Sequence, residues 1–272
     1  MTEGSITTRD GVRLDYTDSG TPGGRPVVLV AGFKAARQAW LFQTPALEAA
    51  GYRVISLDLR GHGSSERPDF GHSMARRAAD LDDLLTQLDL RRVVLVGQSM
   101  GGNTVWAYLR DFGAARIAGI VIVDQTPKML NSDDWPFGYY GYTAENADTF
   151  FAESIPNTGH GTPLWRRGMR LVRLLRAMRS SMGGAKGLTA GELELLGDHA
   201  RADWRSVIAG SVVPTLFVAG AESEMWPSGH AAAAAALSPS ATSVVIEHDG
   251  HAANIEQPEK FNDALLTFLA GL

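Results

Sequence analysis

Residues 93–102 read VVLVGQSMGG and combine a run of branched apolar residues with a glycine-flanked serine and the start of a helical pattern. The apolar run predicts a strand buried on both faces, and the residues from Met100 onward predict a helix. Between them, Gly97, Ser99 and Gly101 form a G-x-S-x-G pattern. The two glycines leave room for a sharp strand-to-helix turn in which larger side chains would clash. We therefore expect Ser99 at the carboxyl edge of a sheet, as a candidate nucleophile. The alternative is a glycine-rich turn that merely begins a helix.

Strand patterns of the same kind recur before and after this stretch. They are RLDYTDS (13–19), PVVLVAG (26–32), YRVISLDL (52–59), IAGIVIVD (117–124), PTLFVAG (214–220) and TSVVIEHDG (242–250). Helical patterns lie between them, at residues 40–50, 73–88, 100–111, 230–237 and 258–269. This alternation predicts an α/β fold in which helices flank a mostly parallel sheet.

Residues 126–205 interrupt the alternation, because they contain no convincing strand pattern. They mix aromatic residues (DDWPFGYYGY) with a basic helical stretch (LWRRGMRLVRLLRAMR). We interpret them as a helical cap, here called the cap segment. The chain then divides into a first core part (1–125), the cap segment (126–205) and a second core part (206–272). A membrane-surface element would also explain the basic helix, although arginines on the outer face of a cap helix are sufficient.

Composition excludes several classes of function. The chain of 272 residues suits one α/β domain with an insertion, and its net charge of -5 provides no basic surface for nucleic acid or anionic lipid. The absence of cysteine excludes thiol nucleophiles and cysteine metal sites. The N-terminus lacks the apolar core of a signal peptide, and no apolar run reaches the roughly 20 residues that span a bilayer. We therefore expect a cytoplasmic protein with no nucleic-acid partner, membrane partner, metal or cofactor.

The glycine-flanked serine and three further segments resemble the α/β-hydrolase superfamily. These segments are VVLVAGF (27–33), DLRGHGSSERP (58–68) and DGHAANIEQPEKF (249–261). The resemblance covers nearly the whole chain outside the cap segment. It implies an eight-stranded sheet with a helical cap, and a hydrolase whose nucleophile is Ser99. A serine at this position argues against the superfamily's dehalogenases and epoxide hydrolases, which use aspartate.

The same resemblance implies the base and the oxyanion hole. His251 follows the last strand on a glycine turn, where the family places its base, whereas His248 lies nearby and His62 is expected to brace a loop. The backbone N–H groups of Met100 and Phe33 are the expected oxyanion donors. The usual histidine–glycine pair before the second donor is replaced by Ala31 and Gly32, which leaves the backbone donor in place.

The catalytic acid departs from the commonest family pattern. The position that usually carries aspartate is occupied by Ser223, which cannot stabilise an imidazolium as a carboxylate does. Glu222 and Glu224 flank it, but either would need a shifted loop to reach His251, and we interpret both as solvated loop residues. Asp124, at the end of the preceding strand pattern, is the acid that we favour, because some family members support their histidine from this strand. Its alternative role is to cap the turn before Pro127.

The substrate is less well defined, since a superfamily does not specify one. We expect acyl transfer from a small apolar carboxylic ester or lactone. Trp40, Trp135, Phe137 and Tyr140 are candidate pocket residues; the alternative is that Trp40 is core and the other rings fill the seam between cap and sheet. Cofactor-free peroxidases or perhydrolases, hydroxynitrile lyases and slow-turnover ligand receptors share the same triad, and these alternatives remain open.

Overall fold

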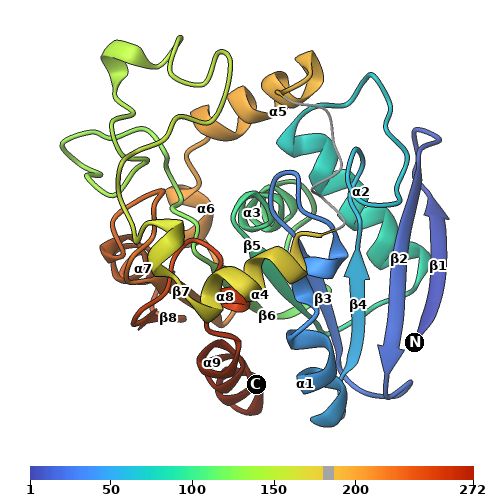
Figure 1. Ribbon diagram of the computed structural model, residues 1–272. Coiled ribbons are helices and arrows are strands. Elements are labelled where there is room, and N and C mark those ends of the chain that lie inside the picture. The colour runs from blue at the N-terminus through green and yellow to red at the C-terminus, as the bar shows by residue number, and fades with distance from the viewer. Residues whose placement is uncertain (180–186) are drawn as a thin grey trace.

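The computed structural model describes residues 1–179 and 187–272, and its centre is an eight-stranded sheet (Figure 1). The strands are β1 (Thr2–Thr7), β2 (Arg13–Gly20), β3 (Pro26–Val30), β4 (Arg53–Leu57), β5 (Val93–Gln98), β6 (Ile117–Val123), β7 (Thr215–Gly220) and β8 (Ala241–Ile246). Their order across the sheet is β1-β2-β4-β3-β5-β6-β7-β8. Only the β1–β2 and β2–β4 pairs of this sheet are antiparallel. The predicted α/β fold with a mostly parallel sheet is therefore confirmed.

Helices connect the strands from β3 onward and cover both faces of the sheet. They are η1 (Arg37–Trp40), α1 (Gln43–Ala49), α2 (Met74–Gln87), α3 (Met100–Phe112), η2 (Ala144–Asn146), η3 (Leu164–Arg166), α4 (Met169–Ala177), α5 (Ala190–Arg201), α6 (Arg205–Ala209), α7 (Gly229–Ala235), α8 (Ala253–Glu256) and α9 (Pro258–Ala270). Within residues 1–179 and 187–272, no helix has the length and apolar character needed to cross a bilayer.

Side chains that alternate along the strands build a separate hydrophobic cluster on each face. On β3, Val28 and Val30 pack into the cluster that contains residues of α2 and α3, whereas Val27 and Leu29 pack into the cluster that contains residues of α1 and α9. Burial on both faces explains why these strands read as unbroken apolar runs. Trp40 belongs to the second cluster and is 0% exposed. Its assignment to the substrate pocket is therefore wrong, because its ring is enclosed in the core.

The cap segment leaves the sheet after β6 and gathers at one end of it, with its loops and α5 at the top of Figure 1. Its helix α4 contacts α8 and η1, and α5 contacts α2. Several of its rings are buried in the cluster on the α2–α3 face, among them Trp135, Tyr139, Tyr142 and Phe151. These rings meet one another or their neighbours edge to face. Much of the aromatic content that the sequence shows therefore serves to attach the segment.

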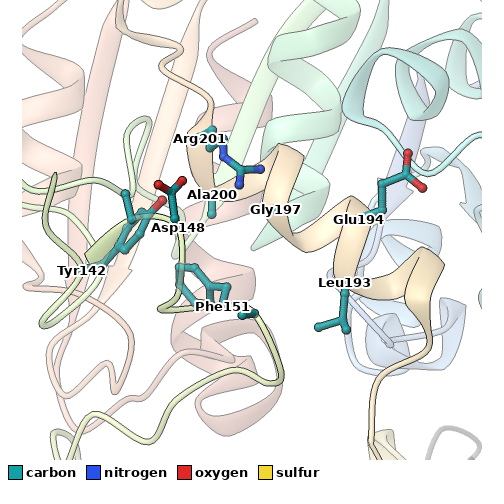
Figure 2. A pocket seen from close by; sticks show the side chains of 10 residues that line it. Tyr142, Asp148, Phe151, Leu193, Glu194, Gly197, Ala200 and Arg201 are labelled. Atoms are coloured by element: carbon teal, nitrogen blue, oxygen red, sulfur yellow. The ribbon is translucent and has the colours of Figure 1, made fainter. Parts of the chain in front are cut away.

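A cavity of about 320 Å³ lies within the cap segment (Figure 2). Tyr142, Asp148 and Phe151 line it on the loop side, and Leu193 and Arg201 line it from α5. None of the residues of the predicted triad contributes to its lining. This cavity is therefore separate from the candidate active site.

Candidate active site

Ser99 occupies the turn between β5 and α3 in a conformation that side chains rarely adopt. Its φ is 53°, and such backbone strain persists only where the surrounding structure enforces it. A Cβ at Gly97 would overlap the backbone of Gly101, and a Cβ at Gly101 would overlap the carbonyl oxygen of Val30. The glycines of the G-x-S-x-G pattern are thus required by close backbone packing, and that packing holds Ser99 at the end of the strand.

His251 lies in the loop between β8 and α8, directly beside Ser99. Its Nε2 is 2.8 Å from the Ser99 hydroxyl. Trp226 packs edge-on against the imidazole with 5.3 Å between ring centroids. The backbone N–H of His251 donates to a carboxylate oxygen of Glu224 at 3.0 Å. Both the ring and the backbone of this histidine are therefore held in place.

Asp124 follows β6 directly, and its carboxylate is fully buried. Oδ2 lies 2.7 Å from Nδ1 of His251 and accepts a hydrogen bond from the Ser223 hydroxyl at 2.6 Å. Oδ1 accepts from the backbone N–H of Gly220 at 3.0 Å and lies 3.4 Å from Nε2 of His230. Four groups thus surround the carboxylate, which satisfies the requirement that a buried charge be hydrogen-bonded.

The pKa shifts of this pair follow from burial and mutual contact. Burial alone would raise the pKa of Asp124, but hydrogen bonds from His230 and His251 outweigh it and lower the pKa to about 2. Burial alone would lower the pKa of His251, but the hydrogen bond and charge of Asp124 outweigh it and raise the pKa. Asp124 is therefore ionised at neutral pH, and it stabilises the protonated form of the imidazole.

The hydrogen-bond directions define what the three residues can do together. Because an ionised Asp124 can only accept, Nδ1 of His251 donates to it, and Nε2 is left to accept the proton of Ser99. The structure thus brings together the serine, histidine and aspartate that the sequence singles out. The imidazole is placed to remove the serine proton, and the carboxylate is placed to stabilise the resulting cation.

The segments that carry the predicted oxyanion donors both adjoin Ser99. Met100 is the first residue of α3. Gly32 packs so closely that an added Cβ would lie 3.0 Å from the Cβ of Ser99, which places the loop that contains Phe33 next to the serine. The role of the N–H groups of Met100 and Phe33 as oxyanion donors stays a prediction.

A family model described as alpha/beta hydrolase fold matches residues 25–258. The chain belongs to the α/β-hydrolase family.

Known members of this family resemble the chain over its whole length. It is 32% identical to a non-heme chloroperoxidase of Kitasatospora aureofaciens, with 97% of this chain and 98% of that protein covered. The crystal structure of a bromoperoxidase of Bacillus anthracis superposes with a TM-score of 0.82 at 29% identity, covering 99% of this chain and 100% of the other. A thermophilic esterase of Thermogutta terrifontis superposes with a TM-score of 0.75 at 27% identity, covering 100% and 99%. These similarities support a serine hydrolase of the α/β-hydrolase fold.

Glu222 and Glu224 of this α/β hydrolase are not the solvated loop residues that the sequence suggests. Glu222 is hydrogen-bonded by the Thr162 hydroxyl and paired with Arg170 at 2.8 Å. Glu224 is paired with Arg167 at 3.1 Å. Both arginines come from the cap segment, so the two glutamates attach this segment to the edge of the sheet.

The arginines themselves point inward, which corrects their expected position on the outer face of the cap. Arg167 and Arg170 both contact the buried carboxylate of Glu256 in α8, at 2.9 and 2.6 Å. Arg173 pairs with Glu259 at 2.8 Å. Arg166, Arg176 and Arg179 of the same stretch are exposed, as expected. Beside them lie exposed apolar residues, and these are Leu164, Trp165, Met169, Val172, Leu175 and Met178.

The other candidate pocket residues lie in the cap segment and differ in burial. Trp135 is 4% exposed and its indole N–H donates to the hydroxyl of Thr126 at 3.0 Å. Phe137 and Tyr140 are half-buried, and Tyr140 stacks on His160. Trp135 thus packs in the seam, whereas Phe137 and Tyr140 keep exposed ring surface. Their contact with a substrate stays a prediction.

Two neighbours of Asp124 were not anticipated from the sequence. Ser223 stands where the commonest family pattern has the acid, and here it donates a hydrogen bond to the acid instead. His230, at the start of α7, adds a second imidazole. It lies 106 residues from Asp124 along the chain, and no local pattern of residues indicates such a contact.

Proposed function

We propose that this α/β hydrolase cleaves small carboxylic esters or lactones through an acyl-enzyme on Ser99. The observation that carries the proposal is the unbroken line of hydrogen bonds from the Ser99 hydroxyl through His251 to Asp124, at 2.8 and 2.7 Å. A serine hydroxyl is a weak nucleophile until a neighbouring base takes its proton, and this geometry provides that base.

In the proposed reaction, Ser99 attacks the carbonyl carbon while His251 takes the hydroxyl proton. The N–H groups of Met100 and Phe33 bind the oxyanion. His251 then returns the proton to the leaving oxygen, which departs as an alcohol, and the acyl group stays on Ser99. A water molecule releases the acid by the reverse sequence of proton transfers. Asp124 stays ionised throughout and stabilises the imidazolium in each half-reaction.

Labelling with a fluorophosphonate tests the nucleophile. Peptide mapping should place the label on Ser99, and Ser99→Ala should abolish both labelling and ester hydrolysis. Sustained turnover of 4-nitrophenyl butyrate distinguishes an enzyme from a slow ligand receptor, for which a few events per hour would be expected. A label elsewhere, or hydrolysis that survives Ser99→Ala, would overturn the proposal.

Perhydrolysis is the second candidate, because relatives over the full length of the chain are a non-heme chloroperoxidase and a bromoperoxidase. In this reaction hydrogen peroxide takes the place of water and attacks the acyl group on Ser99. The products are a peracid and free Ser99, with the proton again passing through His251. The peracid then oxidises a halide by two electrons and is itself reduced to the carboxylic acid.

A bromination assay separates the two candidates. Bromination that requires acetate, bromide and peroxide together, and that Ser99→Ala abolishes, would establish perhydrolysis. Efficient ester hydrolysis with no bromination above a protein-free control would leave ester cleavage as the function.

A further inference from the structure

Helix α4 and the residues just before it turn apolar side chains outward. Met169 is 66% exposed, and Val172 and Leu175 are exposed as well. Their spacing of three residues places them along one side of the helix. Before the helix, Leu164 is exposed and Trp165 is 81% exposed. A surface helix normally turns its apolar side to the core, and apolar residues that are exposed together rather than singly mark a surface that binds a partner.

Ion pairs on the opposite side hold the helix in this orientation. Helix α4 lies against α8 (Figure 1). Arg170 is bound to the buried carboxylate of Glu256 at 2.6 Å, and Arg173 is bound to Glu259 at 2.8 Å. A rotation that buried the apolar side would break both pairs and remove a partner from the carboxylate of Glu256, which is costly for a buried charge. The attachment of the helix therefore keeps its apolar side exposed.

Arginines accompany the exposed apolar side chains. Arg176 lies four residues after Val172 and thus on the same side of the helix, and Arg166 and Arg179 flank the helix. All three arginines are exposed. In the described parts of the chain none of them forms a salt bridge, and Arg166 lies over the ring of Trp165, 5.6 Å from its centroid. Positive charges and apolar side chains therefore alternate on this surface, although the whole chain carries a net charge of -5.

Charge and shape favour an anionic lipid surface over a second copy of the chain. In a two-fold dimer this surface would meet itself, so the arginines of one copy would face those of the other. The outward side of a single helix is convex, and a protein partner would have to offer a matching groove. A bilayer adapts to a convex surface, because its phosphates pair with arginines while the boundary of its acyl chains accepts apolar side chains.

We propose that residues 164–179, here called the exposed cap stretch, bind the protein to the surface of an anionic membrane. Its apolar side chains enter the headgroup region, and its three exposed arginines pair with lipid phosphates. A helix bound in this way lies in the plane of the interface. The proposal replaces the expectation that the protein has no membrane partner, because a net charge does not describe where the charges lie. It concerns binding and does not depend on the bond that Ser99 cleaves.

Sedimentation with vesicles tests the proposal. The protein should bind vesicles of phosphatidylcholine that contain about 30% phosphatidylglycerol at least about tenfold more tightly than vesicles of phosphatidylcholine alone. Sodium chloride at about 0.5 M should remove most of this difference, because salt screens the attraction between arginines and phosphates. Equal binding to the two kinds of vesicle, or binding to neither, would overturn the proposal.

Substitution of the arginines tests the electrostatic part of the binding. Arg176→Gln should weaken binding to the anionic vesicles about fivefold, and Arg166→Gln, Arg176→Gln and Arg179→Gln together should weaken it about a hundredfold. Arg91→Gln removes the same charge from an exposed arginine elsewhere, and it should leave binding unchanged. An equal loss in Arg91→Gln and Arg176→Gln would show that only net charge matters, which would overturn the assignment to the exposed cap stretch.

Substitution of the apolar side chains tests their insertion into the headgroup region. Met169→Ser combined with Val172→Ser should weaken binding to the anionic vesicles by about tenfold. Val212→Ser changes an exposed valine that lies outside the cap segment, and it should have no effect. The melting temperature should stay unchanged in all of these variants, because each replaced side chain is exposed.

Sedimentation equilibrium without lipid distinguishes the membrane from a second copy. If the exposed cap stretch binds lipid, Met169→Ser with Val172→Ser should leave the molecular mass of the protein in solution unchanged. A dimer that these substitutions dissociate would show that a second copy covers the stretch, and it would overturn the proposal.

Discussion

The edge of the sheet and the cap segment are positioned by different forces. At the edge, Ser99 and Asp124 each follow a buried parallel strand directly. Close backbone packing shapes the turn at Ser99, and the backbone N–H of Gly220 binds the Asp124 carboxylate. The cap segment consists of short helices and loops, and it is joined to the edge by packed rings and by ion pairs such as Arg167–Glu256. Strand ends and backbone packing therefore position the reacting groups, whereas packed rings and ion pairs attach the cap segment.

Because of this difference, substitutions in the two regions should have different effects. Changes at the edge should affect the chemical step and leave stability nearly unaltered. Changes at the attachment points should affect stability and access to the site, and should alter the chemical step only indirectly. Substitutions in the two regions should therefore have distinguishable effects on kcat and on the free energy of unfolding.

Asp124→Asn should have the largest effect. The amide cannot stabilise the imidazolium and favours the wrong tautomer of His251, so kcat should fall by about 10⁴-fold, as the same change does in the Ser-His-Asp template. Steady-state kinetics with 4-nitrophenyl butyrate measures the loss, and thermal melting serves as the control for folding. A variant that keeps more than a tenth of the activity would show that another group supports His251.

An exchange of the acid and its serine neighbour should restore part of that activity. Ser223 contacts the same oxygen of Asp124 that His251 contacts, so an aspartate at position 223 would approach Nδ1 from the adjacent strand. Asp124→Ser with Ser223→Asp should exceed Asp124→Ser alone by about 10²-fold in kcat/KM, roughly half of the loss on a logarithmic scale. No gain would mean that the loop after β7 cannot present a carboxylate to this histidine.

The acid also shows how far sequence reasoning extends. Ser99 and His251 lie in segments that combine a strand pattern with glycine turns, and strand ends are predictable because burial imposes long apolar runs. Asp124 directly follows such a run, and the resemblance to family members that support their histidine from this strand points to it as the acid. Ser223 and His230 complete its surroundings through contacts that span 99 and 106 residues. Contacts of this kind arise from the packing of adjacent strands and leave no periodic signal in the sequence.

Arg167→Met should primarily affect the attachment of the cap segment. The side chain of Glu256 is 1% exposed and would lose one of its two arginine partners. Because Arg170 remains, the expected loss in unfolding free energy is about 2 kcal/mol, below the 3–5 kcal/mol typical of a fully broken buried pair. Urea unfolding measures this loss in unfolding free energy. In kinetics, KM should rise by a larger factor than kcat falls. A loss confined to kcat would contradict the expectation that the attachment of the cap segment affects mainly stability and access to the site.

The cap segment resisted prediction for a related physical reason. Its arginines were assigned to the surface because a helix with a basic side usually turns that side to water. Here Arg167 and Arg170 bind Glu256 across 89 and 86 residues, while the other side of the stretch exposes apolar residues together with its remaining arginines, such as Arg176. The pairing depends on carboxylates that the sheet edge supplies from elsewhere in the chain. A pattern read within the helix alone does not show which of its arginines have such partners.

Asp249→Asn should stabilise the protein at alkaline pH. Burial, and then the charges of Glu256 and Asp124, raise the pKa of Asp249 to about 8. The folded protein thus retains a proton that the unfolded chain releases near pH 4, and stability falls as pH rises from about 4 to 8. The asparagine variant lacks this dependence, so its advantage should be on the order of 5 kcal/mol at pH 9 and vanish at pH 4. Urea titrations at the two pH values measure it.

Glu222→Gln should have the smallest effect, although Glu222 lies one residue from the position that usually carries the acid. Its side chain is 30% exposed, and its partners are Arg170 and Thr162 of the cap segment, together with exposed His248. Exposed ion pairs contribute about 0–1 kcal/mol, so stability should fall by about 0.5 kcal/mol and kcat should change by less than twofold. Glu224→Gln provides the matched comparison, because Glu224 also accepts the backbone N–H of His251. If Glu222→Gln reduced kcat more than Glu224→Gln, the position of the imidazole would depend on the attachment of the cap rather than on the backbone of the sheet edge.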